Sequence, residues 1–165
     1  MLARLRKAKE NGEGGFTLIE LLVDMIIIGI LAAIAIPVFL SQREKAQDTA
    51  AKADVTTIGK EIATYYVDNP DNAGLEITTP TTGENEGRYV LSATASDVDP
   101  VALGVDARNL GKVSANVEIG TTTDVTKAAT WCVSVTNAKG DKAVVGYKYS
   151  ATGGLEEGTC TLPTP

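Results

Sequence analysis

Two carboxylates stand at the start of a long apolar stretch, and cleavage of one peptide bond would place an amine beside them. From residue 21 to residue 40 the only charge is at Asp24, and Glu20 directly precedes this stretch. A carboxylate inside an apolar membrane span costs on the order of 2.5–3.5 kcal/mol, so each acid should have a partner or a task. Cleavage between Gly15 and Phe16 would create an ammonium one helical turn from Glu20.

The segment in front of Phe16 is suited to such a cleavage. Gly14 and Gly15 resist helix formation, so this segment should be extended and accessible at the membrane surface. A secretory signal instead carries its cleavage site behind the apolar run, marked by small residues. Here the run ends in PVFLSQR at residues 37–43, which offers no such site. These residues alone leave two alternatives: an uncleaved anchor helix, or cleavage in front of the run.

The sequence GFTLIE at residues 15–20, followed by a stretch rich in Ile, Leu and Ala and then Pro37, resembles the N-terminus of type IV prepilins. The resemblance favours cleavage over an uncleaved anchor. It implies that a prepilin peptidase cuts between Gly15 and Phe16 and that the new amine of Phe16 is methylated. The mature chain would then assemble through its N-terminal helix into a filament of identical subunits, with the help of pilus assembly machinery in the inner membrane.

In an assembling bundle, Glu20 could meet the Phe16 amine of a neighbouring copy, which would fix the axial register of the subunits. Asp24 departs from the family, in which an aliphatic residue is usual, and lies one turn beyond Glu20 on the same helix face. Two close acids cannot both stay ionised cheaply. We therefore expect Asp24 to be protonated, to share the amine or to face a polar group.

Two residues should weaken the apolar helix itself. Pro37 removes a backbone hydrogen bond and clashes with the carbonyl four residues back, at a cost of about 3 kcal/mol or more. Gly29 adds up to about 1 kcal/mol. A bend near Pro37 is therefore expected, or a loosened stretch between Gly29 and Pro37 once the helix enters a filament.

Charge predicts the orientation of this helix. Twenty residues make roughly 30 Å of helix, the thickness of the hydrocarbon core of a bilayer. The bases that precede the span should stay cytoplasmic; they are Arg4, Arg6, Lys7 and Lys9. The uncut chain would therefore lie in the cytoplasmic membrane with its N-terminus inside, and the assembled filament would be on the cell surface.

Composition excludes several classes of protein. Removing a leader with four bases and two acids from a chain with 15 bases and 21 acids leaves a formal charge of −8, which disfavours a nucleic-acid site. The chain contains no histidine, which rules out Ser-His and Cys-His nucleophile pairs. Two cysteines are too few for a structural zinc site. No metal, other cofactor or enzymatic activity is expected. Cys132 and Cys160, both in the exported part, should form a disulfide, with free thiols as the alternative.

The predicted fold class is α+β, with one long N-terminal helix packed on a small antiparallel sheet. The helix should run from Phe16 to about Val67, where breakers follow, and a loop should occupy residues 68–87. An apolar stripe should line its second half, at Ala51, Val55, Ile58, Ile62 and Tyr65. The expected strands are residues 88–93, 112–119, 130–136 and 142–150, with a hairpin loop at 137–141 and an ambiguous segment at 98–110.

The domain organisation follows from these elements: a cleaved leader at 1–15, a transmembrane and filament-core helix at 16–40, and an outward-facing pilin domain at 41–165. The predicted function is the major subunit of a type IV pilus, acting in adhesion, motility or DNA uptake. The alternatives are a type II secretion pseudopilin, a minor pilin at the filament tip, and an anchored domain that never assembles. Pseudopilins often use a calcium-binding loop, for which Asp97 and Asp99 are only weak candidates.

Overall fold

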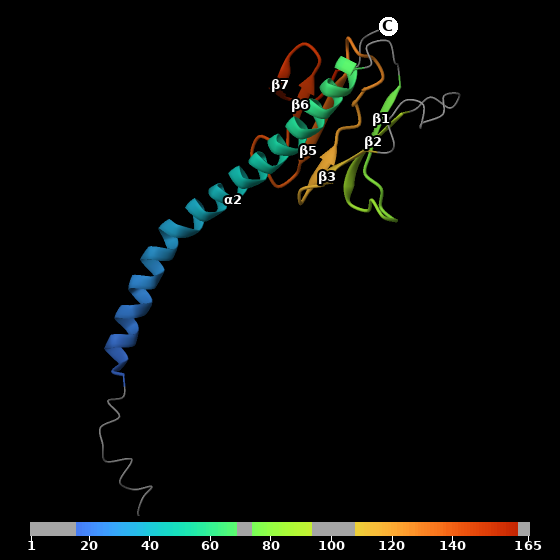
Figure 1. Ribbon diagram of the computed structural model, residues 1–165. Coiled ribbons are helices and arrows are strands. Elements are labelled where there is room, and N and C mark those ends of the chain that lie inside the picture. Colours follow the sequence, from blue (N-terminus) through green and yellow to red (C-terminus); the bar gives the residue numbers. More distant parts are fainter. Residues whose placement is uncertain (1–15, 69–73, 94–107, 162–165) are drawn as a thin grey trace, which may run out of the picture. The chain divides into compact units, whose positions relative to one another are not determined.

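The computed structural model describes residues 16–68, 74–93 and 108–161. It contains a long helix, α2 (Leu18–Asp68), which Figure 1 shows together with most of the strands. The strands are β1 (Leu75–Thr78), β2 (Arg88–Ala93), β3 (Arg108–Lys112), β4 (Val117–Ile119), β5 (Cys132–Asn137), β6 (Tyr147–Ser150) and β7 (Gly154–Glu157). The chain divides into two compact units, Met1–Ser41 and Gln42–Pro165.

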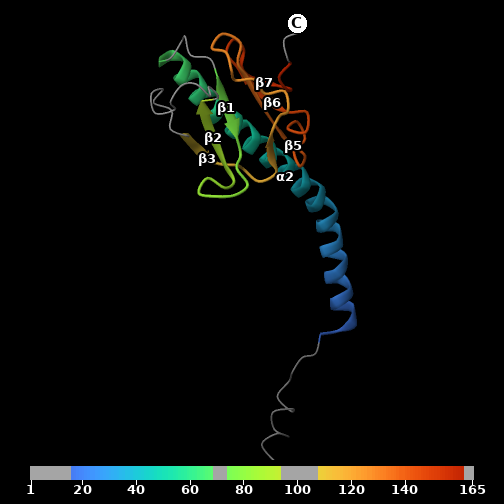
Figure 2. The ribbon, with the colours of Figure 1, turned by 90° about the vertical axis from the view of Figure 1, so that its right-hand side faces the viewer.

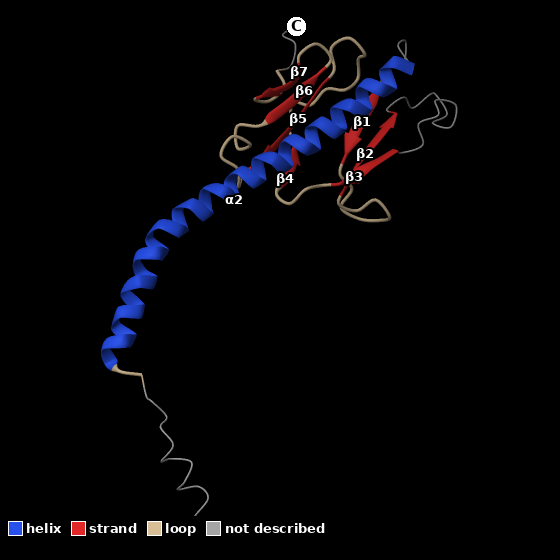
Figure 3. Ribbon diagram, turned by 60° about the vertical axis from the view of Figure 1, so that its left-hand side comes forward, coloured by secondary structure: helices blue, strands red, loops and turns tan. Residues whose placement is uncertain are grey.

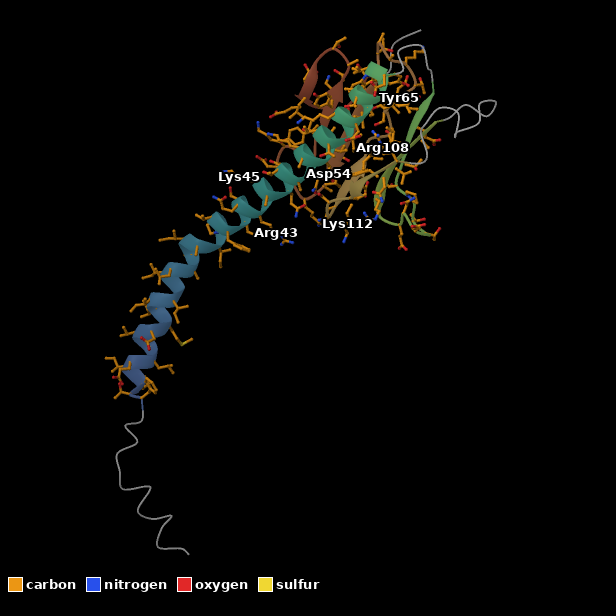
Figure 4. All side chains as sticks on the ribbon, in the orientation of Figure 1. Arg43, Lys45, Asp54, Tyr65, Arg108 and Lys112 are labelled. Carbon is orange, nitrogen blue, oxygen red and sulfur yellow. A yellow bond between two sulfur atoms is a disulfide. The ribbon has the colours of Figure 1, made fainter. Side chains whose placement is uncertain are left out.

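In the first unit, α2 exposes apolar side chains around its whole circumference. The large hydrophobic residues from Phe16 to Leu40 are between 45% and 87% exposed. Figure 4 shows carbon side chains on all sides of this part of the helix. By length and composition the helix could cross a membrane. A helix that is apolar all round must be covered by lipid or by other protein.

In the second unit, α2 is amphipathic and supplies one side of the hydrophobic core. The predicted stripe is confirmed, since its five members are buried: Ala51, Val55, Ile58, Ile62 and Tyr65. This stripe belongs to one cluster with apolar residues of both sheets, including Leu91 of β2 and Val133 of β5. Burial of the stripe, rather than helix propensity alone, holds this half of α2 in place.

The strands form two antiparallel sheets instead of the single sheet that was expected. One sheet has the order β1-β2-β3 and the other has the order β4-β5-β6-β7. Within the second unit the two sheets flank α2, with β1–β3 on one side and β5–β7 on the other (Figures 2 and 3). The predicted α+β class is confirmed, with two small sheets sharing one helix.

Several strand predictions need correction. Of the segment predicted as one strand at 112–119, only Lys112 belongs to β3 and only residues 117–119 form β4. The chain turns between the two strands, where Asn116 has a positive φ of 63°. The strand predicted at 142–150 begins only at Tyr147. Val145 instead lies in the loop before β6 and is 67% exposed. The loop predicted at residues 68–87 contains β1, and β7 was not predicted. Residues 98–107 of the segment left ambiguous lie outside the described residues.

A buried carboxylate on α2 anchors the first sheet to the helix. Asp54, only 9% exposed, accepts a hydrogen bond of 2.9 Å from the hydroxyl of Tyr89 in β2. It accepts two more from Ser114, at 2.9 Å from the backbone nitrogen and 2.8 Å from Oγ. Burial, together with the nearby Asp54 charge, raises the pKa of Tyr89, so the phenol stays a donor even at alkaline pH. Figure 4 marks Asp54 on the part of α2 beside the strands.

A second buried carboxylate, Asp48, anchors the loop between β5 and β6. It accepts hydrogen bonds from the backbone nitrogens of Lys142, at 3.1 Å, and Ala143, at 2.8 Å. Beside it, the amide nitrogen of Asn137 donates to Gln47 Oε1 at 2.9 Å. Each sheet therefore has its own polar attachment to α2, six residues apart along the helix.

The second sheet is also fixed by a disulfide and by a close approach to α2. Cys132 and Cys160 are bonded, with their Cα atoms 5.9 Å apart, so the predicted disulfide is confirmed. Tyr149 of β6 packs where a side chain on Gly59 would have to stand. Its ring stacks on Trp131, with the ring centroids 6.0 Å apart. Glycine at position 59 is therefore what lets this sheet lie directly on the helix.

We expect the substitution Asp54→Asn to lower the free energy of unfolding by roughly 2–3 kcal/mol, because hydrogen bonds to a charged group contribute about 1.5–3 kcal/mol. Thermal unfolding of the full chain in detergent, followed by circular dichroism, measures the change. The exposed acid Glu118, changed to Gln, is the matched control and should shift stability by less than about 0.5 kcal/mol. Equal effects of the two substitutions would contradict the anchoring role of Asp54.

Candidate processing and assembly site

The N-terminal turn of α2 brings together three of the residues singled out from the sequence. Phe16 lies just before the helix and is 87% exposed. Glu20 stands in the first turn, and Asp24 follows one turn later. Gly15, on the other side of the predicted cleavage point, lies outside the described residues. The described part of the site is therefore the part that would remain in the mature chain.

Thr17 and Glu20 form a reciprocal cap at the start of the helix. The backbone nitrogen of Thr17 donates to Glu20 Oε2 at 2.9 Å, and the Thr17 hydroxyl donates to the same oxygen at 2.7 Å. In return, the backbone nitrogen of Glu20 donates to Thr17 Oγ1 at 3.3 Å. This arrangement satisfies amide donors that lack partners inside the helix. One oxygen of Glu20 is thus engaged within its own subunit.

Asp24 faces a groove along the same side of the helix. This shallow groove has a volume of about 340 Å³ and is lined by Phe16, Ile19, Glu20, Val23 and Asp24. Within residues 16–68, 74–93 and 108–161, the structure gives Asp24 no hydrogen bond or ion pair. A second groove, of about 420 Å³, has only apolar lining, from Leu18, Leu21, Leu22, Met25 and Ile26. Of these two grooves, only the first is lined by charged side chains.

Gly29 and Pro37 lie further along the helix and take no part in this groove. Both are inside α2, which is assigned as helix on either side of them. A Cβ atom added at Gly29 would meet nothing within 4 Å, so packing inside the subunit does not require glycine there. The bend or loosened stretch expected at these residues in a filament stays a prediction.

The sequence analysis missed Thr17. A signal was available, because a Thr followed three residues later by Glu in front of an apolar run is the capping-box pattern. The predicted weak calcium candidates, Asp97 and Asp99, lie outside the described residues. Among the described residues, no group of three or more acids and cysteines could hold a metal ion.

Comparison with known proteins places the chain in a family. Residues 11–36 match the family described as the prokaryotic N-terminal methylation motif. The type II secretion system core protein G of Vibrio cholerae is 35% identical over 129 residues, which cover 63% of this chain and 88% of that protein. No solved structure gives a significant match.

Two further relatives match over shorter lengths. The core protein G of Pseudomonas aeruginosa is 42% identical over 57 residues, covering 34% of this chain and 40% of that protein. The type IV major pilin protein PilE1 of Neisseria gonorrhoeae is 32% identical over 108 residues, covering 64% of this chain and 47% of that protein. The chain thus spans less than half the length of these two relatives.

A methylation motif at the N-terminus, one long apolar helix and small antiparallel sheets define a pilin-like protein. The chain belongs to this family, in which type II secretion core proteins and type IV pilins are its relatives. These relatives are structural proteins and not enzymes, as expected from the sequence.

We expect Thr17→Val to loosen the start of α2, because valine keeps the shape of threonine but removes the hydroxyl that bonds to Glu20. The amide of Glu20 should then exchange its hydrogen faster. Hydrogen exchange read by mass spectrometry on the full chain in a detergent micelle measures this. Thr17→Ser is the matched control, because serine retains the hydroxyl. Unchanged exchange in the valine variant would show that the cap does not hold this turn.

Proposed function

We propose that the chain is a filament subunit that is cut after Gly15, methylated at Phe16 and polymerised through the first half of α2. The observation that carries this proposal is the apolar surface of that half, which is exposed on every side from Phe16 to Leu40. Lipid can cover this surface before assembly, and identical helices can cover it afterwards. A prepilin peptidase and an assembly platform in the inner membrane are the partners that this route requires.

Within this class, we propose a major type IV pilin as the first candidate. The disulfide between Cys132 and Cys160 supports it, because it braces the C-terminal region that a pilin presents on the filament surface. A type II secretion pseudopilin is the second candidate. It is favoured by the match to core protein G of Vibrio cholerae, which extends over 88% of that protein.

The composition of surface fibres separates the two candidates. For a major pilin, mass spectrometry of filaments sheared from cells should find this chain as the most abundant protein, beginning at methylated Phe16. Deleting its gene should remove the filaments and leave protein secretion intact. For a pseudopilin, deletion should instead stop the secretion of exported enzymes. Chains that begin at Met1, or after Leu40, would contradict the proposed processing.

We expect Glu20→Ala to abolish or severely reduce filaments while the chain still inserts into the membrane, because the substitution removes the carboxylate proposed to receive a neighbour's amine. Asp24→Val is the paired comparison and should still give filaments, since Glu20 remains. Electron microscopy of cells, with immunoblots of membrane fractions, measures both effects. Normal filaments in the Glu20 variant, with none in the Asp24 variant, would show that the roles of the two acids are reversed.

A further inference from the structure

We propose that Asp24 is the second carboxylate of a binding site for the N-terminus of a neighbouring copy, whose ammonium lies between Glu20 and Asp24. This inference rests on the proposed function, because the ammonium exists only after cleavage. The site is the groove lined by Phe16, Ile19, Glu20, Val23 and Asp24. Its occupant is the phenylalanyl ammonium that begins a second copy of this chain.

The chemistry of the groove matches this occupant. Two carboxylates stand one turn apart and can bind an ammonium between them. The apolar side chains of Ile19 and Val23 line the same groove and can pack against the phenyl ring of the incoming Phe16. The second groove, lined only by apolar side chains, offers no acceptor for an ammonium. Charge complementarity therefore selects this face of the helix.

Spacing along the helix requires that the ammonium come from another chain. Asp24 is eight residues beyond Phe16, which is about 12 Å at a rise of 1.5 Å per residue. The amine of the same subunit cannot reach that far up its own helix. Asp24 also has no hydrogen bond or ion pair with any residue that the structure describes, whereas Oε2 of Glu20 already accepts two hydrogen bonds from Thr17.

The site sets the axial offset between the two helices in contact. An ammonium midway between Glu20 and Asp24 lies opposite residue 22, six residues beyond Phe16, which gives an offset of about 9 Å for parallel helices. Pairing with Glu20 alone would give about 6 Å, and pairing with Asp24 alone about 12 Å.

Solid-state NMR of filaments labelled uniformly with ¹³C and ¹⁵N tests the contact directly. We expect magnetisation transfer from the amine nitrogen of Phe16 to both Cδ of Glu20 and Cγ of Asp24. The Asp24 transfer can arise only between chains, because the two groups of one chain are about 12 Å apart. Transfer to Glu20 alone would overturn the proposal and leave the proposed function standing. If processed chains form no filaments at all, both this proposal and the proposed function are contradicted.

Filament stability provides the second measurement. Asp24→Asn filaments should form but should dissociate in detergent about tenfold faster than the wild type, which corresponds to about 1.4 kcal/mol in the activation free energy of dissociation. Asp24→Glu keeps the charge and should stay within about twofold of the wild type. Met25→Leu, in the apolar groove, is the control for a conservative change at this level of the helix. Equal dissociation rates for the Asn variant and the wild type would overturn the proposal.

Discussion

The apolar surface of the first half of α2 is the constraint on which the rest of the structure depends. Among the described residues, its large hydrophobic side chains from Phe16 to Leu40 are all exposed. Such a surface is stable only in lipid or among other apolar helices. The acids Glu20 and Asp24 matter because of that surface, since a charge is costly there unless it meets a partner.

The second half of α2 solves a different problem, which is to hold two small sheets that would be marginal alone. The apolar stripe supplies the buried apolar area. The buried carboxylates of Asp48 and Asp54 accept directional hydrogen bonds. Each carboxylate accepts hydrogen bonds from the segment that carries one sheet. Losing either partner would leave a buried charge uncompensated, so these contacts specify where the sheets sit on the helix. One helix thereby connects the apolar surface of the first unit to the sheets of the second.

How much the sequence predicts depends on how local each signal is. The helix and its stripe were predicted correctly, because the 3.6-residue period of the apolar residues can be recognised within one continuous segment of sequence. The break between β3 and β4 was not, because it depends on a turn with positive φ at Asn116. Asp48 and Asp54 gave no signal as anchors, since their partners lie 35 to 95 residues away in the chain. At the proposed assembly site the two acids were singled out by type and spacing, and their role there stays a prediction, whereas the cap made by Thr17 was overlooked.

The central claim is that copies of the chain bury the first half of α2 against one another. An electron cryo-microscopy map of fibres sheared from cells tests this claim most directly. The account predicts a chain that begins at Phe16 in the fibre core, with apolar helices packed together and the sheets on the outside. Fibres built from other proteins, density continuing before Phe16, or apolar helices left on the fibre surface would contradict it.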